Sequence, residues 1–71
     1  MYKVEFENSN GIRREIGRAA QHNEAFKIIN DFLDDHNYKC YYMRSWVSAE
    51  NETCIDVGSW SEFFYITEVE K

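Results

Sequence analysis

The sequence predicts a single α+β domain over residues 1–71, in which an antiparallel sheet of four to five strands has one helix packed on one face. Three observations predict this class. Polar and apolar side chains alternate in residues 2–7, as in a half-buried strand. Apolar side chains recur every three or four residues in 23–36, as on a helix. Short apolar runs separated by turns fill the rest, so the expected order is ββαββ followed by a C-terminal strand.

The composition restricts the classes of function. A chain of 71 residues builds only one small core, and its aromatic fraction of 17% offsets the small size. The net charge of −5 argues against a generic binder of phosphate backbones. No apolar signal segment follows Met1, and no apolar run approaches the roughly 20 residues of a membrane span. We therefore expect a cytoplasmic protein without a membrane segment.

The N-terminal part of the chain is predicted to form a hairpin. The apolar side chains of residues 2–7 point to the core, and the Asn-Gly pair within residues 8–11 tolerates the positive φ of a tight turn. Residues 12–19 then form the second strand. Arg14 and Arg18 share a face with the two isoleucines of this strand, which favours an edge position, because charged side chains on an edge discourage unwanted pairing.

Residues 23–36 form the predicted helix. Asn23 is expected to cap it, because its side-chain oxygen can accept from the first-turn amides, and Glu24 suits the positive end of the helix dipole. The apolar stripe comprises Ala25, Phe26, Ile29, Phe32 and Leu33. The sheet residues expected beneath this stripe are Val4, Phe6, Met43, Ile55 and Val57.

The next two strands, residues 39–47 and 53–57, have two alternative registers. A five-residue loop between them places Arg44 opposite Asp56, whereas a four-residue loop places Arg44 opposite Val57. We favour the five-residue loop, because it pairs opposite charges across the strands and keeps the arginine out of the core. In this register Trp46 faces away from the helix.

The C-terminal segment is predicted to contain a capped turn and a last strand. Gly58 permits a sharp bend, and Ser59 with Glu62 matches the spacing of a capping box. Residues 63–69 then alternate as a strand. Trp60, at the tip of the turn, has no structural partner that the pattern identifies.

No combination of residues indicates an enzyme. His22 and His36 lie about 21 Å apart at opposite ends of the helix, because each residue adds 1.5 Å of rise. Cys40 and Cys54 are roughly 20 Å apart in the favoured register and lack the CxxC spacing of a metal site. The glycines are isolated, so no phosphate-binding loop is present. We expect a protein without catalysis, metal or cofactor, whose cysteines are reduced.

The predicted sheet offers a surface for another protein. Residues 39–47 have large side chains on both faces, and a single helix covers only one face. The uncovered part should form an apolar patch edged by charge, which is typical of a partner or self-association surface. The candidate residues are Tyr42, Arg44 and Trp46, with Trp60 beside them. A structural homodimer subunit is a further alternative.

Nucleic-acid binding is the alternative from a different class. Arg13, Arg14 and Arg18 cluster in the second strand, and Tyr42 with Trp46 resembles a stacking platform for single strands. Acidic side chains beside this surface oppose phosphate binding, which makes protein binding the leading hypothesis.

The segment IDVGSWSEFFYI, residues 55–66, resembles the ending of small uncharacterised accessory proteins encoded by phages and mobile elements of Gram-positive bacteria. The resemblance covers about twelve residues and carries no catalytic residue. It implies a short accessory protein that binds a host or phage protein. Acidic proteins of this setting include inhibitors of host defence nucleases, such as anti-CRISPR proteins.

This resemblance implies a specific role for the acidic side chains. Asp31, Asp34 and Asp35 form an acidic helix face, which without a partner is simply a solvated surface. In a nuclease inhibitor they would meet a basic groove together with Glu50 and Glu52.

Overall fold

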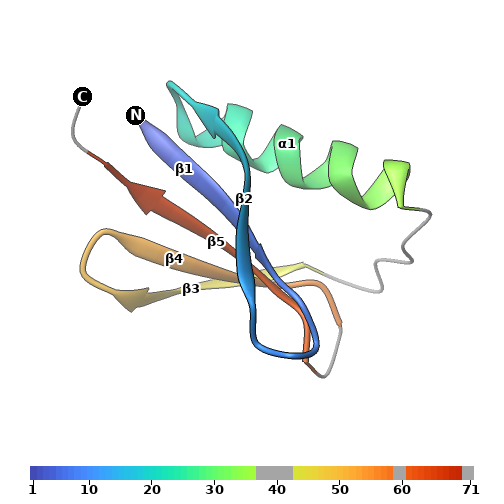
Figure 1. Cartoon of the computed structure of the whole chain (residues 1–71). Coiled ribbons are helices and arrows are strands. Elements are labelled where there is room, and N and C mark those ends of the chain that lie inside the picture. The colour runs from blue at the N-terminus through green and yellow to red at the C-terminus, as the bar shows by residue number, and fades with distance from the viewer. Residues whose placement is uncertain (37–42, 59–60, 70–71) are drawn as a thin grey trace.

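A computed structural model describes residues 1–36, 43–58 and 61–69 of the chain. In chain order the elements are β1 (Tyr2–Glu7), β2 (Arg13–Ala19), α1 (His22–Asp35), β3 (Arg44–Ala49), β4 (Glu52–Asp56) and β5 (Phe63–Glu68). The five strands form one antiparallel sheet in the order β2-β1-β5-β4-β3, with α1 on one face (Figure 1). The predicted α+β class is thus confirmed.

The C-terminal strand β5 occupies the centre of the sheet. It pairs with β1 on one side and with β4 on the other, so that Phe64 lies opposite both Phe6 and Ile55. The edges are therefore β2 and β3, and α1 connects one edge to the other. β4 directly precedes β5 in the chain, whereas β1 lies at the N-terminus, so the pairing of β5 with β1 joins the two hairpins into one sheet.

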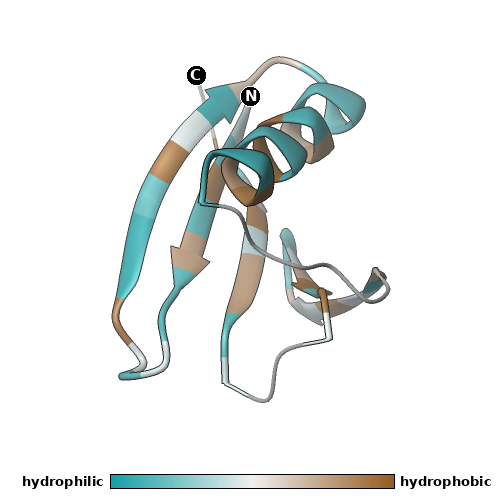
Figure 2. Cartoon of the chain, turned by 90° about the vertical axis from the view of Figure 1, so that its right-hand side faces the viewer, coloured by the Kyte–Doolittle hydropathy of each residue, from teal (hydrophilic) through white to brown (hydrophobic). Residues whose placement is uncertain are grey.

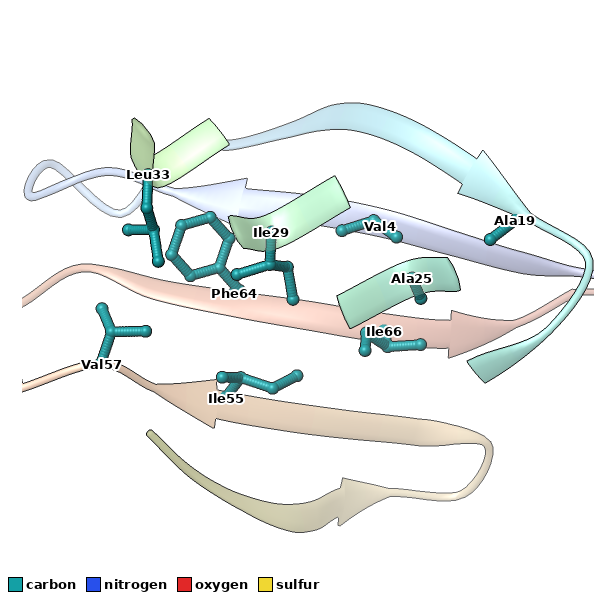
Figure 3. Packing of buried hydrophobic residues seen from close by; sticks show 9 residues of the cluster. All are labelled: Val4, Ala19, Ala25, Ile29, Leu33, Ile55, Val57, Phe64 and Ile66. Atoms are coloured by element: carbon teal, nitrogen blue, oxygen red, sulfur yellow. The ribbon is translucent and has the colours of Figure 1, made fainter. Parts of the chain in front are cut away.

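The core lies between α1 and the middle of the sheet. The helix contributes Ala25, Ile29 and Leu33, which are buried as predicted. Their neighbours in the core cluster are Val4, Ala19, Ile55, Val57, Phe64 and Ile66 (Figure 3). Met43 was predicted here and is instead 37% exposed, so this prediction is wrong. The physical reason is that α1 lies over β1 and β2 and leaves the β3 edge uncovered.

The helix begins one residue earlier than predicted. Gln21 is extended and occupies the cap position, without a side-chain hydrogen bond. Asn23 is therefore already inside the first turn, and its Oδ1 accepts only from the amide of Glu24, at 3.0 Å. The prediction of Asn23 as the cap is wrong, because a cap residue must have non-helical backbone angles. At the other end His36 is the C-cap, and its amide donates to the carbonyl of Phe32 at 3.1 Å.

The edge strand β2 contains a bulge opposite β1. Pairing shifts between Val4 and Glu5, so that Ile16 and Gly17 both face the helix. A Cβ on Gly17 would come within 3.0 Å of the Ile28 side chain, which explains the glycine at this close approach. The bulge also corrects the expectation that Arg14 and Arg18 share a face, because it reverses the alternation between them.

The β3–β4 hairpin has the favoured register. Arg44 lies opposite Asp56 and Trp46 lies opposite Cys54. The loop is shorter than the predicted five residues, because β3 runs to Ala49 and the turn occupies only 50–51. A bulge between Val47 and Ala49 absorbs the additional residue. Because of this bulge, the predicted register of β3 and β4 is correct although the predicted loop length is wrong.

The segment after β4 is described only in part. Gly58 has a φ of 95°, and its amide donates to Oδ1 of Asp56 at 2.9 Å, which matches the predicted bend. Ser59 of the predicted capping box and Trp60 lie outside the described residues, as do Cys40 and Tyr42.

Candidate functional site

The edge strand β3 is exposed on both of its faces. All six of its residues are exposed. Figures 1 and 2 show the reason: α1 lies beside β1 and β2, and the β3–β4 hairpin lies at the far side of the sheet. On its outer side β3 has no pairing strand within the described residues. It therefore presents main-chain donors and acceptors together with side chains of two faces.

Large apolar side chains concentrate at this edge. Among the described residues, five large hydrophobic side chains are exposed, and three of them are Met43, Trp46 and Val47. Trp46 is 45% exposed and lies opposite Cys54, on the face away from the helix. Val47 is 76% exposed and lies opposite Thr53, on the helix side. An apolar surface on both sides of an unpaired edge is typical of a docking strand.

An ion pair fixes the start of this edge to the sheet. Nη2 of Arg44 donates to Oδ2 of the buried Asp56 at 3.0 Å, and the other oxygen of this carboxylate accepts from the Gly58 amide. The arginine side chain itself stays 67% exposed. A buried carboxylate with two charge-assisted or main-chain donors is well satisfied, and the pair holds the Arg44 guanidinium across the strands, toward β4.

The opposite edge of the sheet, β2, is protected by charge. Its sequence RREIGRA contains four charged residues in seven, whereas RSWVSA of β3 contains one in six. Arg18 pairs with Glu15 at 3.1 Å. Charged side chains along an edge discourage strand addition, so of the two edges β3 is the one open to pairing.

The face away from the helix is partly covered by Arg13. Arg13 is the first residue of β2, and its side chain, on the face away from the helix, reaches across β1 and β5 toward β4. Nη1 of Arg13 therefore lies 2.9 Å from Oε2 of Glu52 on β4, and its guanidinium stacks 3.5 Å from the ring centroid of Tyr65. The Tyr65 hydroxyl in turn donates to Oε1 of Glu7 at 2.8 Å. This network occupies the arginine that a nucleic-acid site would need.

Burial and hydrogen bonding shift the pKa values of three side chains in and beside this network. Burial, followed by the hydrogen bond to Glu7, raises the pKa of Tyr65 to about 12. Burial also raises the pKa of the Cys54 thiol, which weakens it as a nucleophile. Burial opposes ionisation of Glu52, but hydrogen bonds from Ser48 and Arg13 outweigh it and lower its pKa. Tyr65 and Glu52 therefore have structural partners in this network, and Cys54 is a buried free thiol beside it.

We expect the Tyr65 proton to be visible in an alkaline titration. The folded pKa of about 12 exceeds the ordinary value of 10.0, so the contribution of Tyr65 to stability is complete below pH 10 and decreases as the pH rises through 12. Near-ultraviolet absorbance should show a tyrosinate step near pH 12 that the Tyr65→Phe variant lacks. If the titration curves of wild-type protein and Tyr65→Phe differ only in the size of a step near pH 10, the buried, hydrogen-bonded environment of Tyr65 is contradicted.

The predicted acidic helix face is separate from β3. Asp31 pairs with Lys27 at 3.1 Å, and Asp34 and Asp35 are exposed without an ion pair in the described part of the chain. Asp31 and Asp35 line a shallow pocket with Ile16 of β2, at the opposite side of the sheet from β3. The structure thus does not bring the carboxylates and Trp46 into one surface.

The basic residues of the alternative site are dispersed as well. Arg13 and Arg18 lie on the face away from the helix, and each is bound to a carboxylate. Arg14 lies opposite Phe6, on the helix side. The bulge in β2 therefore prevents the three arginines from forming one basic face.

Small-molecule and metal sites have little support among the described residues. Two shallow pockets enclose about 160 and 190 Å³, below the roughly 300–1,000 Å³ typical of ligand sites. His22 and His36 lie at opposite ends of α1, as predicted, and a ring nitrogen of His36 bonds the Phe32 carbonyl at 3.0 Å. In the same residues no three His, Cys, Asp or Glu side chains gather as metal ligands. No described helix is both long and apolar enough to cross a bilayer.

Comparison of the chain with protein-family models, curated proteins and solved structures finds no match. The resemblance of residues 55–66 to mobile-element proteins therefore stays a prediction. Among the described residues, the β3 edge is the surface that best fits a binding site.

Sequence reasoning identified part of this edge and missed part of it. Arg44 and Trp46 lie where the favoured register places them. Met43 was expected in the core beneath the helix, and the structure leaves both Met43 and Val47 exposed. No local signal identifies this exposure, because it follows from the position of β3 at the far edge of the sheet, which a single helix over the first hairpin does not reach.

Proposed function

We propose that this protein acts without catalysis, by binding another protein along β3. A segment of the partner adds to the sheet as a further strand and contacts Trp46 on one face and Val47 on the other. The observation that carries the proposal is the exposure of all six β3 residues at an edge that lacks protective charge. Strand addition combines main-chain hydrogen bonds with side-chain pockets, and a tryptophan is a frequent centre of binding energy.

The charge of the chain supports a basic partner. The net charge is −5, and Asp34, Asp35 and Glu50 are exposed. Such a field speeds the encounter with a positively charged surface. Together with the resemblance of residues 55–66, it supports the narrower proposal that the partner is a host defence nuclease, whose nucleic-acid groove is basic. The carboxylates of α1 would then contribute long-range attraction, because they lie apart from the strand that docks.

The nucleic-acid alternative is not favoured by any observation on the described residues. Glu52 and Glu15 neutralise Arg13 and Arg18, and phosphate would have to displace these ion pairs.

The test is affinity capture with matched variants, followed by binding measurements on the purified partner. Trp46→Ala removes the apolar side chain of β3, and Ile12→Ala removes one of comparable exposure, 62%, from the distant β1–β2 turn. We expect a partner that wild-type protein and Ile12→Ala retain and Trp46→Ala loses, with affinity lowered about tenfold or more. A partner that Trp46→Ala binds as tightly as wild-type protein contradicts a docking site at β3.

A further inference from the structure

The β3 edge is complementary to itself. Two identical strands that pair in antiparallel orientation are related by a two-fold axis, and the residue on this axis faces its own copy. Side chains on opposite residues point to the same face of the combined sheet. Each choice of the axial residue therefore fixes every contact across the edge, and the choices can be compared.

Placing Ser45 on the axis matches all of the exposed large side chains. Arg44 then lies opposite Trp46 of the second copy, on the face away from the helix, so that a cation and an indole become cross-strand neighbours. Met43 lies opposite Val47 of the second copy, on the helix side. Because the two copies are related by a two-fold axis, each contact occurs twice. The small side chains of the two Ser45 copies face each other at the axis.

The other registers centred within residues 44–47 are poorer for identifiable reasons. An axis through Arg44 opposes two arginines directly, which is unfavourable. An axis through Trp46 or Val47 extends the pairing into the bulge between Val47 and Ala49, where the regular alternation of β3 ends. The axis through Ser45 uses residues 43–47 alone, and all of these precede the bulge.

We propose that a second copy of this chain occupies the β3 edge, in antiparallel register centred on Ser45, so that the two sheets form one continuous sheet. The inference rests on the docking role proposed for β3, and it adds a second copy of the chain as a further occupant of the same edge. The apolar and cationic groups match across the axis, and the charged β2 edge ends the combined sheet at both sides.

The interface is small, which sets the expected affinity. Five residues of each strand take part, so the buried area falls in the range of weak, transient contacts. The dimer therefore forms at about micromolar to sub-millimolar concentration and dissociates on dilution. This reversibility leaves β3 accessible to a heterologous partner at lower concentration.

Sedimentation equilibrium from about 10 μM to about 1 mM tests the association. We expect reversible dimers of wild-type protein and of Ile12→Ala, and an association constant at least about tenfold lower for Trp46→Ala. Circular dichroism of the variants verifies that each remains folded. A monomeric mass at about 1 mM, or equal association of wild-type protein and Trp46→Ala, overturns the proposal.

Cross-linking tests the register, in a background with Cys40→Ser and Cys54→Ser. Residues opposite each other in an antiparallel pair have Cα atoms about 4.5–5.5 Å apart, within the reach of a disulfide. With oxidised glutathione, Ser45→Cys should give a covalent dimer, whereas Val47→Cys should not, because its two copies lie roughly 13 Å apart along the strands. Faster cross-linking of Val47→Cys overturns the Ser45 register.

The two proposals fail separately. A monomer whose capture of another protein depends on Trp46 contradicts self-association and leaves the docking role of β3 intact. Loss of both self-association and Trp46-dependent capture contradicts both proposals.

Discussion

Replacing Phe64 with alanine is expected to lower the free energy of unfolding by about 3–5 kcal/mol. Phe64 is fully buried on the central strand β5. Its ring centroid lies 5.1 Å from that of Phe6 and 5.5 Å from that of Phe32, and these two rings are 4.8 Å from each other. The substitution opens a cavity where the helix, β1 and β5 meet. Against a total of about 5–15 kcal/mol for a small domain, the loss is large.

Thermal unfolding monitored by circular dichroism measures this effect, and the melting temperature should fall by at least about 12 °C. Phe63→Ala is the matched control, because its side chain lies on the opposite face of β5 and is only half-buried. We expect it to cost roughly half as much or less. Equal losses for the two variants would contradict a core that lies on the Phe64 face of β5.

Replacing Ile29 with alanine is expected to cost about 2–5 kcal/mol. Ile29 is fully buried at the middle of α1 and packs in the core cluster with Val4 and Ile66. The helix has no side-chain cap at its N-terminus, so this packing, rather than local capping, holds it on the sheet. Chemical denaturation monitored by tryptophan fluorescence gives the change in free energy.

Asn30→Ala is the control for this experiment. Asn30 is exposed, and alanine favours the helix more than asparagine does, so stability should change by no more than about 0.5 kcal/mol. A loss at Asn30→Ala that equals the loss at Ile29→Ala would place a different helix face on the sheet.

Local patterns were sufficient to predict the first hairpin, the helix and the pairing of β3 with β4. The apolar stripe identified the buried helix residues, because helical periodicity depends only on near neighbours in sequence. The register followed from the opposite charges of Arg44 and Asp56, since a shift of one residue would have turned the arginine into the core.

Features that depend on distant segments could not be predicted in this way. The pattern of residues 63–69 indicates a strand, but it does not indicate that this strand inserts between β1 and β4. The reach of Arg13 to Glu52 follows from the coiling of the whole sheet, which no local pattern encodes. The exposure of Met43 follows from the limited area that one helix covers.

The candidate site illustrates the same limit. Sequence reasoning found an excess of large side chains near Trp46, and attributed the uncovered part to one sheet face. The structure instead leaves uncovered an edge, with Trp46 on one side and Val47 on the other. This difference changes the proposed contact from a flat patch to a strand that extends the sheet.

Amide hydrogen exchange of β3 is the most direct test of the claim that a partner strand adds to the sheet at this edge. Exchange is followed at low concentration and under conditions where sedimentation shows a complex, either with a second copy or with a captured partner. Strand addition predicts that outward-facing amides within residues 44–47 gain protection in the complex, while the amides of the β1–β2 turn, which are hydrogen-bonded within the turn, do not change. Unchanged exchange throughout β3 in the presence of the complex would contradict docking at this edge.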